Sequence, residues 1–168
     1  MSDKELLDMD LLGYEEEEDT QKDKFLIFCL DNEFYGIEIK YVIEIIGMLE
    51  ITEVPELPNY IRGITNLRGK IIPLMDVRLR FKKPFREYND KTCVIVVDIK
   101  NVSVGLIVDS VSEVLSIPEA NIAPPPKINK ESKNRYIKGI GKTGDGVKLL
   151  LDCDKLLNDD EVDDLANL

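Results

Sequence analysis

The chain has 168 residues, of which 43% are hydrophobic, so it is long and apolar enough for one ordinary globular domain or two small ones. This composition excludes disorder throughout. No apolar run approaches the roughly 20 residues that span a bilayer, and the acidic N-terminus differs from a secretory signal, so we expect a cytosolic protein.

The net charge of −11 is distributed unevenly along the chain. Residues 1–23 carry −8 and residues 152–168 carry −6, which leaves a mildly basic body of +3. A cluster of bases occupies the positions Arg78, Arg80, Lys82, Lys83 and Arg86. We interpret it as a solvated surface face, with nucleic-acid binding as the alternative, because the acidic ends would repel phosphate and no aromatic residues alternate with the bases.

The chain has no histidine, and its three cysteines, Cys29, Cys93 and Cys153, are far apart in the sequence. This composition argues against a zinc site, and it removes the commonest general base at neutral pH. We therefore expect no metal ion and no cofactor. An enzyme would have to use carboxylates, such as those of Glu44, Asp76 and Asp109, or lysines or tyrosines for proton transfer.

Residues 1–22 are predicted to be an acidic disordered tail, because the run Glu15-Glu16-Glu17-Glu18-Asp19 repels itself and little apolar surface accompanies it. From Lys24 the sequence has the period of β-strands. Residues 25–30 and 34–39 flank Asp31-Asn32-Glu33 and predict a hairpin.

A change of period follows this hairpin. Ile39, Val42, Ile43 and Ile46 have the i, i+3, i+4, i+7 spacing of a one-sided helix, and Val108 to Leu115 repeats that spacing with one polar substitution. Two further strands flank a turn near residues 66–70. Asp76 and Asp152 are candidate helix N-caps, and the second precedes a predicted C-terminal helix that begins near Asp154.

The sequence contains an internal repeat. Tyr60-Ile61-Arg62-Gly63-Ile64 recurs 76 residues later as Tyr136-Ile137-Lys138-Gly139-Ile140, and Tyr35-Gly36-Ile37 aligns with Val104-Gly105-Leu106 at an offset of 69. The repeat predicts one small unit used twice, over about residues 24–86 and 90–153, with exchange of strands between the copies allowed. We predict a mostly β protein of two small barrels side by side, followed by a C-terminal helix and acidic tail at residues 154–168, with a partner groove between the barrels.

The two copies differ most at one turn, where Asn66-Leu67-Arg68-Gly69 aligns with Lys142-Thr143-Gly144-Asp145. A hairpin turn needs only glycine or asparagine-like residues, so Leu67 and Arg68 exceed what the turn requires. An arginine beside an apolar residue suits a protein interface, while an internal salt bridge and an anion site are the alternatives. Residues present in both copies, among them Tyr60, Gly63, Asp76 and Glu44, are predicted to have structural roles.

These motifs resemble the CheW family of bacterial chemotaxis coupling proteins over about residues 24–158. The Asn66-Leu67-Arg68-Gly69 turn between apolar strands is the most specific of them. The resemblance implies two SH3-like five-stranded barrels with short helices and a non-catalytic, free-standing adaptor. A small β-barrel enzyme or ligand-binding protein is the alternative.

The resemblance also implies the partners. The adaptor would bridge the cytoplasmic tip of a methyl-accepting chemoreceptor and the regulatory domain of the histidine kinase CheA, and it would be recruited through the receptors to the inner membrane face. A helical receptor tip would enter a groove with apolar walls. The contact residues that the resemblance implies for the two partners together are Ile39, Val42, Glu44, Ile45, Asn66, Leu67, Arg68, Gly69, Val104, Leu106, Val108 and Val111.

Overall fold

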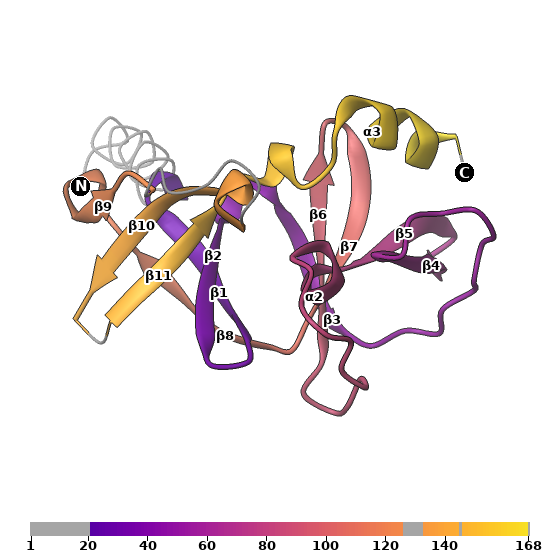
Figure 1. The fold of residues 1–168 in the computed structure, drawn as a ribbon, viewed down its shortest axis with the longest axis horizontal. Helices are drawn as coiled ribbons and strands as arrows, with labels where there is room; N and C mark the ends of the chain where they lie inside the picture. The colour runs from indigo at the N-terminus through magenta and orange to yellow at the C-terminus, as the bar shows by residue number, and fades with distance from the viewer. Residues whose placement is uncertain (1–20, 126–132, 145, 168) are drawn as a thin grey trace, which may run out of the picture.

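A computed structural model describes residues 21–125, 133–144 and 146–167 of the chain. Residues 1–20, which make up nearly all of the predicted acidic tail, lie outside the described residues, as does the last proline of the Pro124–Pro126 run. The described chain forms two mixed β-sheets side by side, with short helices between and beside them (Figure 1). The predicted mostly β class with two β units is therefore confirmed.

Each sheet defines one lobe of the molecule. The six-stranded lobe has the strand order β8-β1-β2-β11-β10-β9, so it has one strand more than predicted. Its strands are β1 (Lys24–Leu30), β2 (Glu33–Glu38), β8 (Ser110–Ser116), β9 (Ile122–Ala123), β10 (Ile137–Thr143) and β11 (Gly146–Leu151). The five-stranded lobe has the order β3-β6-β7-β5-β4. Its strands are β3 (Val42–Gly47), β4 (Ile61–Leu67), β5 (Lys70–Asp76), β6 (Cys93–Ile99) and β7 (Val102–Val108).

The lobes do not coincide with the sequence repeats, because the repeats exchange hairpins. The β1–β2 hairpin of the first repeat joins β8 to β11 of the second, and the β6–β7 hairpin of the second joins β3 to β5 of the first. Each exchanged hairpin is attached through a parallel pair, β2 beside β11 and β7 beside β5. The exchange ties the two repeats together by hydrogen bonds within each sheet, and the two lobes are linked covalently because each repeat contributes strands to both.

A glycine lies at each of these parallel contacts. A Cβ added to Gly36 would lie 2.8 Å from Leu150 Cδ2, and one added to Gly105 would lie 2.6 Å from Leu74 Cδ2. Real Cβ atoms do not approach other atoms so closely, so a side chain at either position would force a buried leucine to move. The predicted structural role of this repeated pair is confirmed.

The hydrophobic core has three parts. Small clusters fill each lobe, Phe25, Ile27, Ile117 and Leu150 in one and Ile72, Leu74, Val94, Val96 and Ile107 in the other. The largest cluster is shared, because it combines residues such as Phe28 and Tyr35 of the six-stranded lobe with Ile95 and Val104 of the five-stranded lobe. The facing sides of the lobes are therefore packed against each other through this shared core, and the partner groove predicted along their junction stays a prediction.

The helix predicted over residues 39–46 is also wrong. A single 3₁₀ turn, η1 (Ile39–Tyr41), leads into β3, whose residues alternate between partly buried and exposed. The register shifts between Val42 and Glu44, which marks a β-bulge at Ile43. β-branched side chains favour a strand, and the bulge breaks the period of two, so the apolar spacing imitates a helix. The helical spacing at residues 108–115 misled in the same way, because most of this segment lies in β8, whose pairing with β1 also contains a register shift.

The helices are short. Asp76 caps α2 (Val77–Arg80) by accepting a hydrogen bond from the main-chain N–H of Leu79, as predicted. Asp152 caps only the 3₁₀ turn η4 (Cys153–Lys155), as its carboxylate accepts from Asp154 N. The C-terminal helix α3 (Asp159–Ala166) begins later than predicted because Asn158 and Glu161 form a capping box. Two more 3₁₀ turns are η2 (Glu119–Asn121) and η3 (Lys133–Tyr136).

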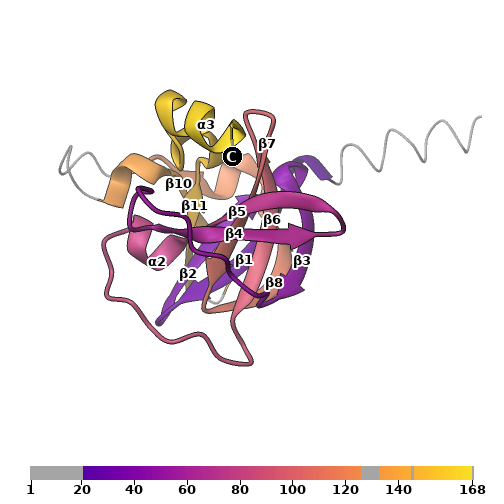
Figure 2. The same ribbon diagram turned by 90° about the vertical axis from the view of Figure 1, so that its right-hand side faces the viewer.

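The helix α3 lies beside β7 at one end of the five-stranded lobe (Figure 2). Within the described residues, no helix is long and apolar enough to cross a membrane. The main-chain N–H of Asp76 donates to Tyr60 O at 2.7 Å, and that of Asp152 donates to Tyr136 O at 2.8 Å. These matching bonds confirm structural roles for the repeated Tyr and Asp pair.

The three cysteines are expected to differ in reactivity. Burial raises the pKa of the Cys153 thiol to about 12, because this side chain lies in the shared core with 1% of its surface exposed. Cys29 and Cys93 are only partly buried. Since the thiolate is the reactive species, titration of the native protein at pH 8 with a disulfide reagent should modify Cys29 and Cys93, and Cys153 only after denaturation. Rapid modification of all three thiols in the native protein would contradict this.

Candidate partner-binding site

The β4–β5 turn holds the arginine that the second repeat lacks. Leu67 pairs with Lys70 across a two-residue turn, in which Arg68 has φ 54° and Gly69 has φ 84°. Positive φ at both central residues favours Asn-Gly, and it is uncommon for a residue with a long side chain. Asn66 Oδ1 accepts a hydrogen bond from Gly69 N at 2.8 Å. The conformation of the turn therefore accounts for Asn66 and Gly69, but it does not favour an arginine at position 68.

The guanidinium of Arg68 lies against Glu44 on β3. Arg68 Nη1 is 2.6 Å from Glu44 Oε1, and the two side chains are 73% and 23% exposed. The internal salt bridge that the sequence left open is thus present, and it joins the two edges of the five-stranded lobe, so the sheet curls on itself. An ion pair as exposed as this stabilises a protein by only about 0–1 kcal/mol. Fold stability is therefore a weak reason for an arginine at this strained position.

Exposed aliphatic side chains lie on the strands beside this ion pair. Ile43 and Ile45 on β3 are 56% and 43% exposed, and Ile71 on β5 is 47% exposed. We call these three residues the five-stranded patch. Exposed apolar residues near a guanidinium are typical of the centre of a protein interface.

The other lobe repeats part of this arrangement. Val114 on β8 is 49% exposed and Val147 on β11 is 54% exposed, and β1 and β2 lie between these two strands in the sheet. We call these two residues the six-stranded patch. Val114 follows Ile45 by 69 residues and Val147 follows Ile71 by 76, the two offsets of the internal repeat. Each lobe therefore presents an aliphatic pair at equivalent positions, but only the five-stranded lobe adds an arginine.

Several predicted contact residues have no surface to offer. Val104, Leu106 and Val108 on β7 are 0%, 0% and 1% exposed in the shared core, so a direct partner contact through their side chains is not possible in this fold. The family resemblance on which this expectation rested does not report burial, and β7 is covered on both faces, so its last five residues are all buried.

The remaining predicted residues divide into two groups. The ion pair, Ile45 and the exposed turn residues Asn66 and Gly69 come together at one place on the five-stranded lobe. Ile39, Val42 and Val111 are partly buried against the shared core, and Leu67 packs against the cluster inside the five-stranded lobe. Prediction missed Ile43, Ile71, Val114 and Val147, and the equivalent spacing of the last three within the repeat is the signal that would have found them.

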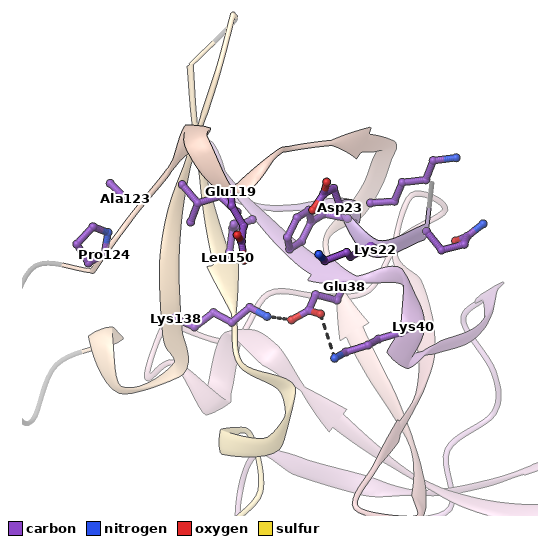
Figure 3. Close-up of a pocket in the computed structure, with 13 residues that line it drawn as sticks. Lys22, Asp23, Glu38, Lys40, Glu119, Ala123, Pro124, Lys138 and Leu150 are labelled. Atoms are coloured by element: carbon purple, nitrogen blue, oxygen red, sulfur yellow. Dashed lines mark ion pairs between the residues drawn. The ribbon is translucent and has the colours of Figure 1, made fainter. Parts of the chain in front are cut away.

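A cavity of about 1410 Å³ is open to solvent and lined by both charged and apolar side chains (Figure 3). Glu38 lies within it between two lysines, with an ion pair to Lys138 and another of 3.4 Å to Lys40. Burial lowers the pKa of Lys138. A carboxylate neutralised by two ammonium groups is poorly placed for acid or base work, so this cavity does not support an active site.

A second cavity, about 100 Å³, is lined by two of the carboxylates on which an enzyme would depend. Both are already engaged. Asp76 caps α2 and accepts from the Tyr88 hydroxyl at 2.7 Å, and Asp109 accepts from Arg78 at 2.8 Å. Ligand pockets usually enclose roughly 300–1,000 Å³. Among the described residues no group of three or more Cys, Asp or Glu side chains is placed to hold a metal ion.

The basic cluster is not the solvated face that we predicted. The side chains of Arg78, Arg80 and Lys83 are only 8–9% exposed, and each pairs with a carboxylate. Arg86 is 54% exposed and lies 3.4 Å from Asp109. Most of the cationic groups that would meet a phosphate backbone are thus buried or paired, and the nucleic-acid alternative loses its support.

Comparison with known proteins adds to this geometry. A family model described as the CheW-like domain matches residues 24–161. The chain is 40% identical to the chemotaxis protein CheW of Klebsiella aerogenes, over 86% of this chain and 87% of that one. It is 32% identical to the chemotaxis protein CheW of Helicobacter pylori, over 88% and 89% of the two chains.

A solved structure agrees with the fold. The crystal structure of the scaffolding protein TtCheW from Thermoanaerobacter tengcongensis matches this chain with a TM-score of 0.76 and 38% identity. The match covers 83% of this chain and 96% of that one.

Proposed function

Because this chain belongs to the CheW family of non-catalytic chemotaxis scaffolding proteins, we propose that it is an adaptor that couples chemoreceptors to the histidine kinase CheA. The finer contacts that we propose are with the cytoplasmic tip of a methyl-accepting chemoreceptor and with the regulatory domain of CheA. The adaptor acts at the inner face of the cytoplasmic membrane, where the receptors hold it.

The observation that carries the proposed contact is the Glu44–Arg68 pair. Arg68 is 73% exposed and strained, is absent from the second repeat, and stabilises the fold little. Beside it lie Ile43 and Ile45, whose exposed surfaces would be buried by a partner. Arginine and adjacent apolar side chains are the composition in which binding energy concentrates.

The two equivalent patches support an adaptor with two ends. Coupling a receptor to a kinase requires that both partners be bound at once, which is possible when each contacts a different lobe. We propose that the five-stranded patch with Arg68 serves one partner and the six-stranded patch serves the other. The regulatory domain of CheA resembles this double-barrel fold, so it could pack against a lobe much as one lobe packs against another.

Replacing Arg68 by Asn tests the contact. Asparagine suits the first central position of this turn, so the free energy of unfolding should stay within about 0.5 kcal/mol or rise. Binding of the CheA regulatory domain, of a receptor fragment, or of both should fall by about tenfold or more, the effect of an interface centre. Denaturant melts and calorimetric titration measure the two quantities.

The control is Glu44→Gln, which keeps the size of the side chain and removes the charge that holds the guanidinium. It should weaken binding less than Arg68→Asn, because Arg68 remains present. Unchanged affinity of Arg68→Asn for both partners would remove Arg68 from the interface.

A further inference from the structure

The helix α2 lies at the junction of the two lobes (Figure 1). It follows β5 of the five-stranded lobe, but its neighbours belong to the other lobe as well. Just after the helix, the Phe81 ring lies between those of Tyr35 and Tyr136, with centroids 5.5 and 5.3 Å away. Both tyrosines belong to the six-stranded side, so the end of α2 is anchored across the junction.

Arg78 of α2 ties three segments together. Its Nη1 donates to Asp31 Oδ1 and to Asp109 Oδ2, each at 2.8 Å, and its Nε donates to Pro84 O at 3.0 Å. Asp31 lies in the β1–β2 turn of the six-stranded lobe, and Asp109 lies in the link where the chain passes from β7 to β8. The side chain of Arg78 is 8% exposed and that of Asp109 is 15% exposed, so the bond between them is largely shielded from water, whereas Asp31 is 45% exposed.

The groups around Arg78 make it hard to replace. Asp109 Oδ2 also accepts from the main-chain N–H of Asp31 at 2.9 Å, which brings the two carboxylates to one place. The hydrogen bond from Arg78 is the main cause that lowers the pKa of Asp31. Lys83 reaches Asp31 only at 3.7 Å, and Arg86 reaches Asp109 at 3.4 Å. Without Arg78, two like charges would face each other across the junction.

The repeat indicates that this arginine is not required by the barrel fold. The equivalent position in the second copy, 76 residues later, is Asp154, which is exposed. A buried arginine that occurs once and contacts the other lobe acts on the relation between the lobes, because the second copy folds with an exposed aspartate at the equivalent position.

We propose that Arg78 is a positioning residue that fixes the angle between the two lobes, so that both partner surfaces are presented in the geometry that simultaneous binding requires. The inference rests on the proposed two-ended adaptor. Linked contacts strengthen each other only when the geometry allows both to form, and that gain is lost when it does not. Each partner alone, which contacts one lobe, needs no such alignment.

The test compares Arg78→Met with the parent protein. Spin labels are attached at exposed positions, one in each lobe, through Glu50→Cys and Lys142→Cys with Cys29 and Cys93 replaced by serine. Pulsed electron spin resonance should show a broadened or shifted distance distribution in folded Arg78→Met, measured without partners. In unlabelled protein, affinity for each partner alone should be nearly unchanged, while formation of the three-component complex should fall about tenfold or more.

Arg86→Met is the matched control, because this arginine also contacts Asp109 but is 54% exposed and is not paired with Asp31. It should leave the distance distribution unchanged. The same distribution in folded Arg78→Met and in the parent would overturn the proposal, and so would equal broadening by Arg86→Met. The distances are measured without partners, so failure of the adaptor function itself would appear separately, as absent binding by the parent.

A second variant covers the case in which Arg78→Met fails to fold. Asp31→Asn removes one arm of the network at a side chain that is 45% exposed, and it leaves the Arg78–Asp109 pair in place. It should broaden the distance distribution by less than the full removal, and an unchanged distribution would overturn the proposal.

Discussion

A Gly63→Ala variant is expected to lose about 3 kcal/mol or more of its free energy of unfolding. Gly63 has φ 148°, a conformation that side chains rarely adopt, and a Cβ there would lie 2.2 Å from Thr52 O. That oxygen accepts the hydrogen bond from Ile64 N, at 2.9 Å, which pairs residue 52 with β4. Backbone cannot move aside as a flexible side chain can. Urea denaturation measures the loss as a lower midpoint with an unchanged slope.

Two other glycines grade this result. Gly47→Ala is the control, because no atom lies within 4 Å of the added Cβ and its φ is not positive. It should change stability by no more than about 0.5 kcal/mol. Gly139 is the repeat equivalent of Gly63, but its Cβ would meet the side chain of Ile122 at 2.7 Å, so Gly139→Ala should lie between the two. Equal free energies of unfolding for Gly63→Ala and Gly47→Ala would contradict the prediction, because the close contact with Thr52 O would then cost no stability.

Acidic substitutions in the two patches are expected to separate the two partners. Ile45→Asp places a charge in the five-stranded patch, and Val114→Asp places one at the equivalent position of the six-stranded patch. Each should weaken one partner by about 30-fold or more, since a residue at an interface centre contributes about 2–4 kcal/mol. The free energy of unfolding should fall somewhat, because aspartate fits a strand poorly. The loss should not exceed about 1 kcal/mol, because both side chains are exposed. Titration of each variant with the CheA regulatory domain and with the receptor fragment measures the effect.

Lys155→Asp controls for the added charge, because Lys155 is exposed in η4, outside both patches. It should leave both affinities unchanged. If Ile45→Asp and Val114→Asp weakened the same partner equally and spared the other, a single partner would span both patches and the two-ended arrangement would be wrong.

Local patterns predicted much of the fold because they report local forces. The hairpin around Asp31 and the turn at residues 66–70 were identified from turn chemistry, and both exist. The caps Asp76 and Asp152 were identified because a side chain satisfies main-chain groups two or three residues away. The prediction of a helix over residues 39–46 was wrong because it also used only a local pattern. A bulge at Ile43 changes the apolar period of a strand, and the sequence does not mark the bulge.

The candidate site was predicted in part. The alignment of the two copies singled out Arg68, and the structure places it beside Glu44, which the repeat comparison had assigned to the scaffold. Glu44 forms an internal ion pair, which agrees with a structural role, while Arg68 remains 73% exposed and available to a partner. Val104, Leu106 and Val108 were expected as contact residues from the family resemblance, and the structure buries their side chains in the shared core, a property that a motif match does not report.

The sequence by itself determined that the chain is one β unit used twice, where its turns lie, and which family motifs it carries, because these depend on neighbours within a few residues or on comparison of the chain with itself. Only the tertiary structure decided which hairpin joins which sheet, which apolar side chains stay exposed, and that Arg78 is buried between two aspartates 47 and 31 residues away. Such contacts form between segments that are distant in sequence, and burial is a property of the assembled fold. A residue's own type and spacing therefore do not reveal them.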